Sequence, residues 1–210
     1  DHGLGTVHLS IDTAEPAIYD KISRSEGRFP KQIEALDNVL ARGELHTYIY
    51  SAVTRVTSPG LGSLVRMVAE RAAHARRATP PMIFAFVKPI GDALVHADSL
   101  MQAFAERAQI ARSVVKAAGA LGVTVGFRNL QACLAPELVP HLVDYYLDDY
   151  SVDLETHRRQ SNAHSVNWQM VDACEQCGHR SLCPGIYGGD VQRFGAADII
   201  AIGRDGLRGS

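Results

Sequence analysis

Strand-like and helix-like segments alternate through residues 1–130, and this alternation constrains the fold more than any other feature of the chain. Residues 6–12 alternate apolar and polar side chains with a period of two, which is typical of a strand. Residues 45–54 are rich in aromatic and β-branched side chains, and residues 81–88 are almost continuously apolar, so both are predicted strands. Residues 123–129 are predicted to form a fourth strand.

The segments between these strands carry the apolar spacing of helices. Helices are predicted over residues 30–41, from residue 61, and over residues 99–120 with Asp98 as the N-cap. Residues 14–28 are predicted to be a loop, and residues 136–148 a further helix. The predicted apolar stripes of the first two helices are Ile33, Leu36 and Leu40, and Leu61, Leu64, Val65 and Val68.

This order of elements predicts an α/β fold with parallel strands and helices packed outside them. We expect two parts: residues 1–130, and a cysteine-rich C-terminal extension over residues 131–210. The formal net charge of −2 gives no basic field for nucleic acid. No apolar run approaches the roughly 20 residues that span a bilayer, so neither nucleic acid nor membrane is an expected partner.

The four cysteines are the main chemical signal: Cys133, Cys174, Cys177 and Cys183. The last three follow a C-x2-C-x5-C pattern, and clustering of this kind without an export signal favours a metal or cluster site in a reducing compartment. We therefore expect a cytoplasmic protein. Cys133 is the only cysteine left to complete a four-thiolate site.

Spacing alone does not choose the metal, because thiolates bind both structural zinc and a 4Fe–4S cluster. Four unligated cysteines are a further alternative, and His179 could replace one thiolate. Trp168, just before the cysteine cluster, is expected to pack around it.

Several segments, taken in order, resemble the radical S-adenosylmethionine (radical SAM) superfamily. The terminal cysteines and the segment around Cys133 resemble the auxiliary-cluster extensions called SPASM and Twitch. The resemblance implies a partial (β/α) TIM-like barrel in an oxidoreductase, with an auxiliary 4Fe–4S cluster on the four cysteines. The segments that carry it are His8–Asp12, Tyr19–Arg24, Gly27–Phe29, Phe86–Gly91, Asn129–Leu134 and Cys174–Cys183.

Two departures from the family pattern limit what this chain does alone. A further SPASM cysteine is absent after Cys183, which makes the site more similar to Twitch. The C-x3-C-x2-C motif that binds the SAM-cleaving cluster is also absent. We therefore expect a fragment, inactive alone, with the second 4Fe–4S cluster on a missing N-terminal part; a second chain supplying the first strands is the alternative.

The resemblance implies that S-adenosylmethionine lies across the carboxyl ends of the strands and yields a 5′-deoxyadenosyl radical. The substrate, a small molecule or a peptide, is not identified, and a flavodoxin or ferredoxin is the expected electron donor. Alternatives stay open: Ser10 could fill the barrel, Asp12 could cap a loop, and Arg55 could be a solvated charge. The residues implied to contact the cofactor are Ser10, Asp12, Thr54, Arg55, Pro89 and Gly91.

Overall fold

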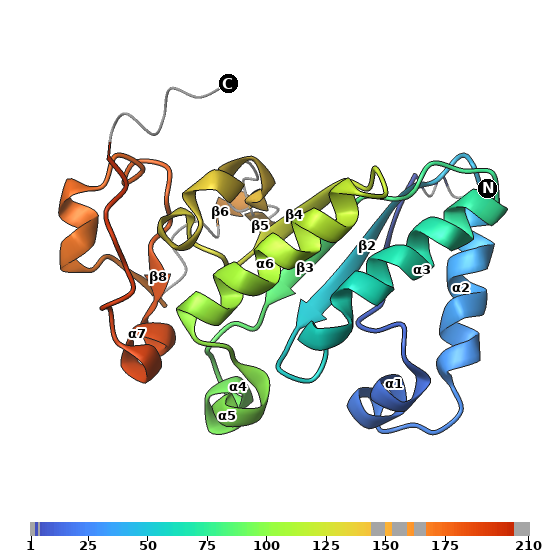
Figure 1. The fold of residues 1–210 in the computed structure, drawn as a ribbon, viewed down its shortest axis with the longest axis horizontal. Coiled ribbons are helices and arrows are strands. Elements are labelled where there is room, and N and C mark those ends of the chain that lie inside the picture. Colours follow the sequence, from blue (N-terminus) through green and yellow to red (C-terminus); the bar gives the residue numbers. More distant parts are fainter. Residues whose placement is uncertain (1–2, 4, 144–149, 153–158, 162–166, 204–210) are drawn as a thin grey trace. The chain divides into compact units, whose positions relative to one another are not determined.

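The computed structural model describes residue 3 and residues 5–143, 150–152, 159–161 and 167–203 (Figure 1). The chain divides into two compact units, and each is described by itself. The first unit comprises Asp1–Val87 and Gln109–Gly126, and the second comprises Lys88–Ala108 and Phe127–Ser210.

The first unit is built on parallel strands. Leu9 of β1 lies opposite Ile49 of β2, and Ile49 lies opposite Met82 of β3. The strand β4 (Val125–Arg128), whose first two residues belong to this unit, completes a four-stranded sheet in the order β1-β2-β3-β4, which confirms the predicted parallel α/β architecture. That the sheet is part of a barrel stays a prediction. The other elements of this unit are β1 (Thr6–Ser10), α1 (Pro16–Ser23), α2 (Phe29–Ala41), β2 (His46–Val53), η1 (Ser58–Gly60), α3 (Leu61–His74) and β3 (Met82–Phe86).

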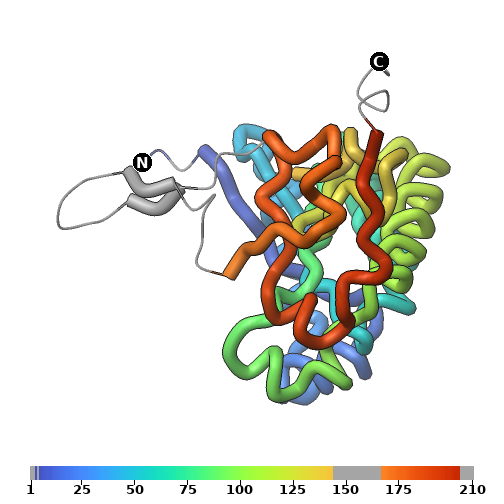
Figure 2. Tube along the Cα trace, turned by 90° about the vertical axis from the view of Figure 1, so that its left-hand side faces the viewer, coloured from blue at the N-terminus to red at the C-terminus, as the bar shows by residue number. Residues whose placement is uncertain are grey.

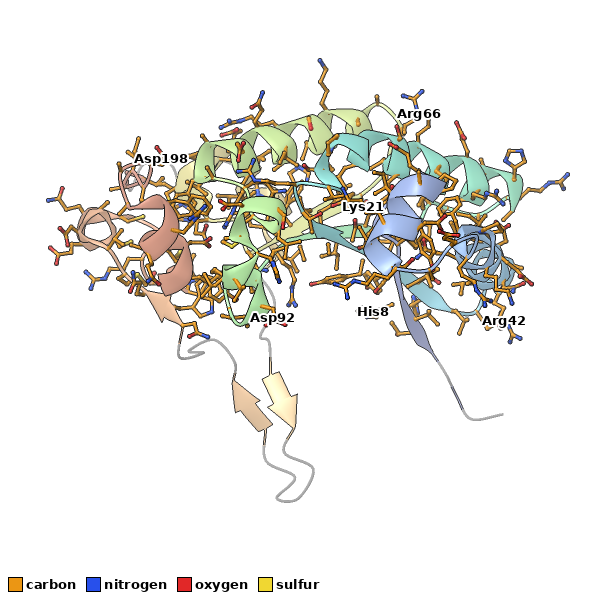
Figure 3. The ribbon with its side chains drawn as sticks, turned by 90° about the horizontal axis from the view of Figure 1, so that it is seen from below. His8, Lys21, Arg42, Arg66, Asp92 and Asp198 are labelled. Carbon is orange, nitrogen blue, oxygen red and sulfur yellow. The ribbon has the colours of Figure 1, made fainter. Side chains whose placement is uncertain are left out.

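Helices cover one face of these strands. The helix α3 and the part of α6 (Phe104–Gly119) from residue 109 lie along the same face (Figures 1 and 3). Every residue of the predicted stripes on α2 and α3 is buried, and these side chains form the core with Ile49 and Phe84. On the side of the strands away from α3, the exposed His8 packs against Tyr48 with ring centroids 5.2 Å apart (Figure 3).

The second unit consists of short elements around a core of Phe104, Ile186 and Ile199. Its short strands pair antiparallel, β5 with β6 and β7 with β8. Among the described residues of both units, no helix has the length and apolar character needed to cross a membrane. Besides the start of α6, the elements are α4 (Asp92–Val95), α5 (Ala97–Leu100), η2 (Ala132–Leu134), η3 (Pro136–His141), β5 (Tyr150–Val152), β6 (Arg159–Ser161), β7 (Trp168–Gln169), η5 (Asp172–Gln176), β8 (Ile186–Tyr187) and α7 (Gly188–Phe194).

Three of the predicted segments differ from the structure. The segment predicted as a loop contains the helix α1, none of whose residues is buried. The predicted helix over residues 99–120 is divided into α5 and α6, so Asp98 lies inside α5 and is not an N-cap. The α6 helix begins later because the Glu106 carboxylate accepts a hydrogen bond from the Ala103 backbone N–H at 2.8 Å, as in a capping box.

The third difference is the helix predicted over residues 136–148. Its first part is the 3-10 helix η3, which contains Pro140, and residues 144–149 lie outside the described part of the chain. Proline lacks the backbone N–H that an α-helix interior requires, so a short, tight helix replaces the predicted α-helix here.

Candidate functional site

Cys133 lies on a tight turn shortly after β4. Asn129 adopts a left-handed backbone conformation with φ of 59°, and its side-chain oxygen accepts a hydrogen bond from the Tyr187 hydroxyl at 3.3 Å. The turn then closes through a hydrogen bond from the Leu134 N–H to the Gln131 carbonyl at 3.1 Å. These bonds fix the backbone on both sides of Cys133 and therefore the position of its thiol.

Of the other three cysteines, Cys174 lies in η5, Cys177 directly follows η5, and Cys183 lies in the turns before β8. The Cys177 N–H donates to the Cys174 carbonyl at 3.2 Å, which turns the C-x2-C segment back on itself. The Cys183 N–H donates to the His179 carbonyl at 2.9 Å and makes a second turn. The whole segment is held against the C-terminal residues by the hydrogen bond from the Gly178 N–H to the Ile202 carbonyl, 2.7 Å long (Figure 2).

All four cysteines line one cavity, and all four are half-buried free thiols. Most of the remaining lining is apolar, while Arg180 brings a positive charge to it. The structure thus brings Cys133 together with the three clustered cysteines, although 41 positions (174 − 133) separate it from the nearest of them. The other lining residues are Gln131, Ala132, Met170, Ala173, His179, Ile186, Ile199, Ile200, Ala201 and Ile202.

The electrostatics of Cys133 reflect this shared environment. Burial raises the pKa of the Cys133 thiol to about 12, and the neighbouring Cys183, Cys174 and Cys177 add to the rise through charge repulsion. Cys133 also packs against the apolar core of Phe104, Ile186 and Ile199, which accounts for its desolvation. A bound cation would reverse this effect, because thiolates are the form that ligates metal.

A backbone N–H is directed at one of the sulfur atoms. The Gly185 N–H donates a hydrogen bond to Cys183 Sγ at 3.4 Å. Gly185 has φ of 102°, and a Cβ added there would lie 2.6 Å from the Gln169 carbonyl oxygen. Only glycine fits both the backbone conformation and the space, so this N–H···S contact depends on Gly185.

The cysteines do not converge on a single point. In the part of the chain that the structure describes, no group of three or more His, Cys, Asp or Glu side chains is placed to hold a single metal ion. The four thiols are nonetheless neighbours, because they line one cavity and because the other three raise the pKa of Cys133 through charge repulsion.

Ser10 and Asp12 lie at the carboxyl end of β1, where the cofactor was expected. The Ser10 carbonyl accepts a hydrogen bond from Gln32 Nε2 at 3.0 Å, and Ser10 is exposed. Asp12 Oδ1 accepts a hydrogen bond from the Ala52 N–H at 2.7 Å and so joins the end of β1 to β2. Burial raises the pKa of the Asp12 carboxyl above its usual value, although the bond from Ala52 opposes that rise.

Thr54 and Arg55 follow β2 at the same end of the sheet. The Thr54 N–H donates to Thr57 Oγ1 at 2.9 Å, and the Thr57 N–H donates to Thr54 Oγ1 at 3.1 Å. These reciprocal bonds occupy the Thr54 hydroxyl in closing the turn. Arg55 is exposed.

Pro89 and Gly91 belong to the second unit and line an open groove. Gly189 packs so closely there that an added Cβ would lie 2.5 Å from the Pro89 carbonyl oxygen. Trp168 lines this groove and stacks on Tyr187 with ring centroids 3.9 Å apart. Trp168 is not among the residues that line the cysteine cavity, and the expectation that it packs around the cysteines stays a prediction.

Gln131 is a cavity residue that the sequence did not indicate. It is only 2% exposed, and its Oε1 is buried without a hydrogen-bond partner among the described residues. A glutamine two positions before a cysteine carries no pattern that marks a site, so only the structure could find it.

The comparisons give no independent family assignment. No protein-family model matches the chain, and neither a curated protein nor a solved structure matches it. The residues of the cavity are therefore the basis for a functional argument.

Proposed function

We propose that this chain holds a 4Fe–4S cluster on Cys133, Cys174, Cys177 and Cys183, as the auxiliary cluster of a radical SAM enzyme whose substrate is unidentified. One observation carries the proposal: four thiols from two distant segments line a single, mainly apolar cavity. Four thiolates are the usual ligand set of such a cluster. The apolar lining would limit access of water to it.

A tetrahedral zinc ion fits these residues less well. Zinc–sulfur bonds of 2.3 Å would place the four sulfur atoms about 3.8 Å from one another around one point. The described residues offer no group placed to hold a single ion. A four-iron cluster keeps its thiolate ligands farther apart than one zinc ion does, and four thiols that line one cavity are compatible with it.

The order of the strands supports the barrel part of the proposal. The strands β1 to β4 are neighbours in the order in which they occur in the chain. A doubly wound sheet reverses its strand order at a switch point, whereas a (β/α) barrel keeps consecutive strands adjacent with helices outside. Within the first unit, α3 and the part of α6 from residue 109 share one face of the strands, as such a barrel requires (Figures 1 and 3).

The chain's own residues would hold, shield and tune the cluster, which when bound would supply one-electron transfer. Gly185 would donate its N–H to the Cys183 sulfur, and the buried side chains of Ile186, Ile199 and Ile202 would exclude water. Cleavage of S-adenosylmethionine is not assigned to this chain, because the C-x3-C-x2-C motif is absent from it. Ser10, Asp12, Thr54, Arg55, Pro89 and Gly91 remain proposed cofactor contacts.

Metal analysis of the protein purified without oxygen tests the proposal. We expect about four iron and four acid-labile sulfide per chain, the content of a 4Fe–4S cluster, with a brown colour. The four cysteines are the only ones in the chain, so Cys133→Ser is expected to reduce the iron content sharply. Asp172→Asn is the matched control, because Asp172 is exposed, near Cys174 in sequence and not part of the cavity lining.

The outcomes separate the alternatives. A colourless protein with one zinc per chain would establish the structural zinc site of a noncatalytic α/β module instead. A protein that takes up neither metal, even after incubation with iron and sulfide under reducing conditions, would overturn the cluster proposal. Retention of iron by Cys133→Ser at the wild-type level would remove Cys133 from the ligand set.

A further inference from the structure

Gln131 places an amide beside the four thiols. It lines the same cavity as the cysteines and is 2% exposed. Its Oε1 is buried and has no hydrogen-bond partner among the described residues. Leaving a buried polar atom unpaired is unfavourable, so Gln131 Oε1 calls for a partner that a group bound in this cavity would bring.

The side-chain amide of glutamine can form hydrogen bonds with both donors and acceptors. Rotation by 180° about the bond to the amide carbon exchanges the oxygen with the NH2 group and leaves the shape of the side chain almost unchanged. The same cavity position can therefore present an acceptor or two N–H donors. Thiolate and inorganic sulfide are negatively charged acceptors, and they require donors.

We infer that the Gln131 side chain turns its NH2 group toward the sulfur atoms of the bound cluster and sets its reduction potential. This inference rests on the proposed function and extends it, because it assigns a positioning and tuning role to a residue that is not a ligand. Together with the Gly185 N–H on Cys183 Sγ, it would provide hydrogen bonds to sulfur from two segments of the chain.

The direction of the effect follows from charge. Reduction adds one negative charge to the cluster, so N–H donors stabilise the reduced form more than the oxidised form. Loss of the amide should lower the reduction potential. A tenfold change in the ratio of oxidised to reduced protein at a fixed potential corresponds to about 59 mV for a one-electron couple, and we expect a shift of that order.

The test compares Gln131→Met and Gln131→Leu with Gln102→Met and Gln102→Leu. Gln102 is also 2% exposed and has an amide without partners among the described residues, but it does not line the cavity. Each full-length protein is loaded with iron and sulfide without oxygen, and its reduction potential is measured by a titration followed by electron paramagnetic resonance. Circular dichroism reports whether each variant folds.

We expect both Gln131 variants to show more negative potentials than the wild type, and both Gln102 variants to match the wild type. Loss of the cluster from both folded Gln131 variants, with the Gln102 variants loaded, would also support the contact. Unchanged potentials in the Gln131 variants, or failure of both to fold, would overturn the inference. A wild-type protein that takes up no cluster would instead refute the proposed function, so the two failures are distinguishable.

Discussion

Arg107 and Asp190 form a buried ion pair that joins the start of α6 to α7, 83 positions apart in the chain. The Arg107 Nη1 donates to Asp190 Oδ2 at 2.9 Å, and Nη2 contacts Oδ1 in the same two-point arrangement. The side chains are 1% and 0% exposed. The rings of Phe104 and Phe194 lie 5.5 and 5.9 Å from the guanidinium carbon, so the pair sits in apolar surroundings where neither charge is hydrated.

Arg107→Met should strongly destabilise the second unit, because it leaves the buried Asp190 carboxylate without the guanidinium. Removing one partner of a buried pair typically costs about 3–5 kcal/mol. Urea unfolding measures this loss, and Arg193→Met is the matched control, since Arg193 and Asp98 are 45% and 89% exposed. An exposed pair contributes roughly 0–1 kcal/mol.

The double variant Arg107→Met/Asp190→Leu should recover most of that stability, because no charge then remains buried. If Arg107→Met costs no more than Arg193→Met, the ion pair does not stabilise the unit.

Asp12→Asn should stabilise the protein at neutral pH. Because burial raises the folded pKa of Asp12 above its ordinary 3.8, the contribution of Asp12 to stability is fully present below pH 3.8 and is lost as the pH rises through the folded value. The asparagine keeps an oxygen for the Ala52 N–H and carries no charge. The urea concentration at the unfolding midpoint should therefore be higher for the variant than for the wild type at pH 7. The two midpoints should become equal near pH 4.

Asp12→Ala is the control for this prediction, because alanine removes both the charge and the acceptor of the Ala52 hydrogen bond. It should be less stable than Asp12→Asn at every pH. A wild type that is more stable than Asp12→Asn at pH 7 would show that the carboxylate is favoured in the folded state.

Alkylation of Cys133 in the protein without bound metal should be slow below pH 9. The thiolate is the reactive form, and a rise in pKa from 9.0 to about 12 lowers its population on the order of a thousandfold relative to the unfolded chain. Mass spectrometry after iodoacetamide treatment compares Cys133 in the folded protein with Cys133 in urea. Equal rates in the two states would contradict the burial of this thiol.

Gly185→Ala should destabilise the cysteine segment and reduce loading of the proposed cluster. The substitution combines a positive φ of 102° with a Cβ placed 2.6 Å from the Gln169 carbonyl oxygen. Gly195→Ala is the matched control, since Gly195 has φ of 75° and open space around the added Cβ. The control should cost about 1–3 kcal/mol from backbone conformation alone, because Gly195 combines its positive φ with ψ of −170°.

The Gly185 variant should cost more than this control, and only the Gly185 variant should lose iron. Urea unfolding and iron content give the two measurements. Equal losses of stability in the two variants would show that the Gln169 backbone shifts away from the added Cβ without lowering the free energy of unfolding.

The sequence predicted the elements whose apolar side chains have a clear periodicity. Ile33, Leu36 and Leu40 mark α2 because that helix buries one stripe against the sheet. The helix α1 has no buried residue and therefore carries no such stripe, which is why it was expected to be a loop. The break between α5 and α6 depends on the hydrogen bond from the Ala103 N–H to the Glu106 carboxylate. The spacing of apolar residues gives no information on such a bond.

The candidate site was predictable where spacing encodes it. The C-x2-C-x5-C pattern places three thiols on consecutive turns, and Cys133 was identified because the chain has one other cysteine. The rest of the cavity was not predictable, because its walls come from segments that meet only in three dimensions. Gln131 and Ile202 line the cavity only because the folded chain brings them there, and no local sequence pattern marks either residue.

The separation of Cys133 from Cys174 has a mechanical consequence. A group bonded to both would act as a cross-link that closes a loop of 41 positions (174 − 133) in the chain. Such a link restricts the unfolded chain in the way a disulfide does, and the entropic benefit grows with loop length. An inorganic centre bound to both segments would therefore also stabilise the folded protein as a cross-link. Its removal would lower the melting temperature.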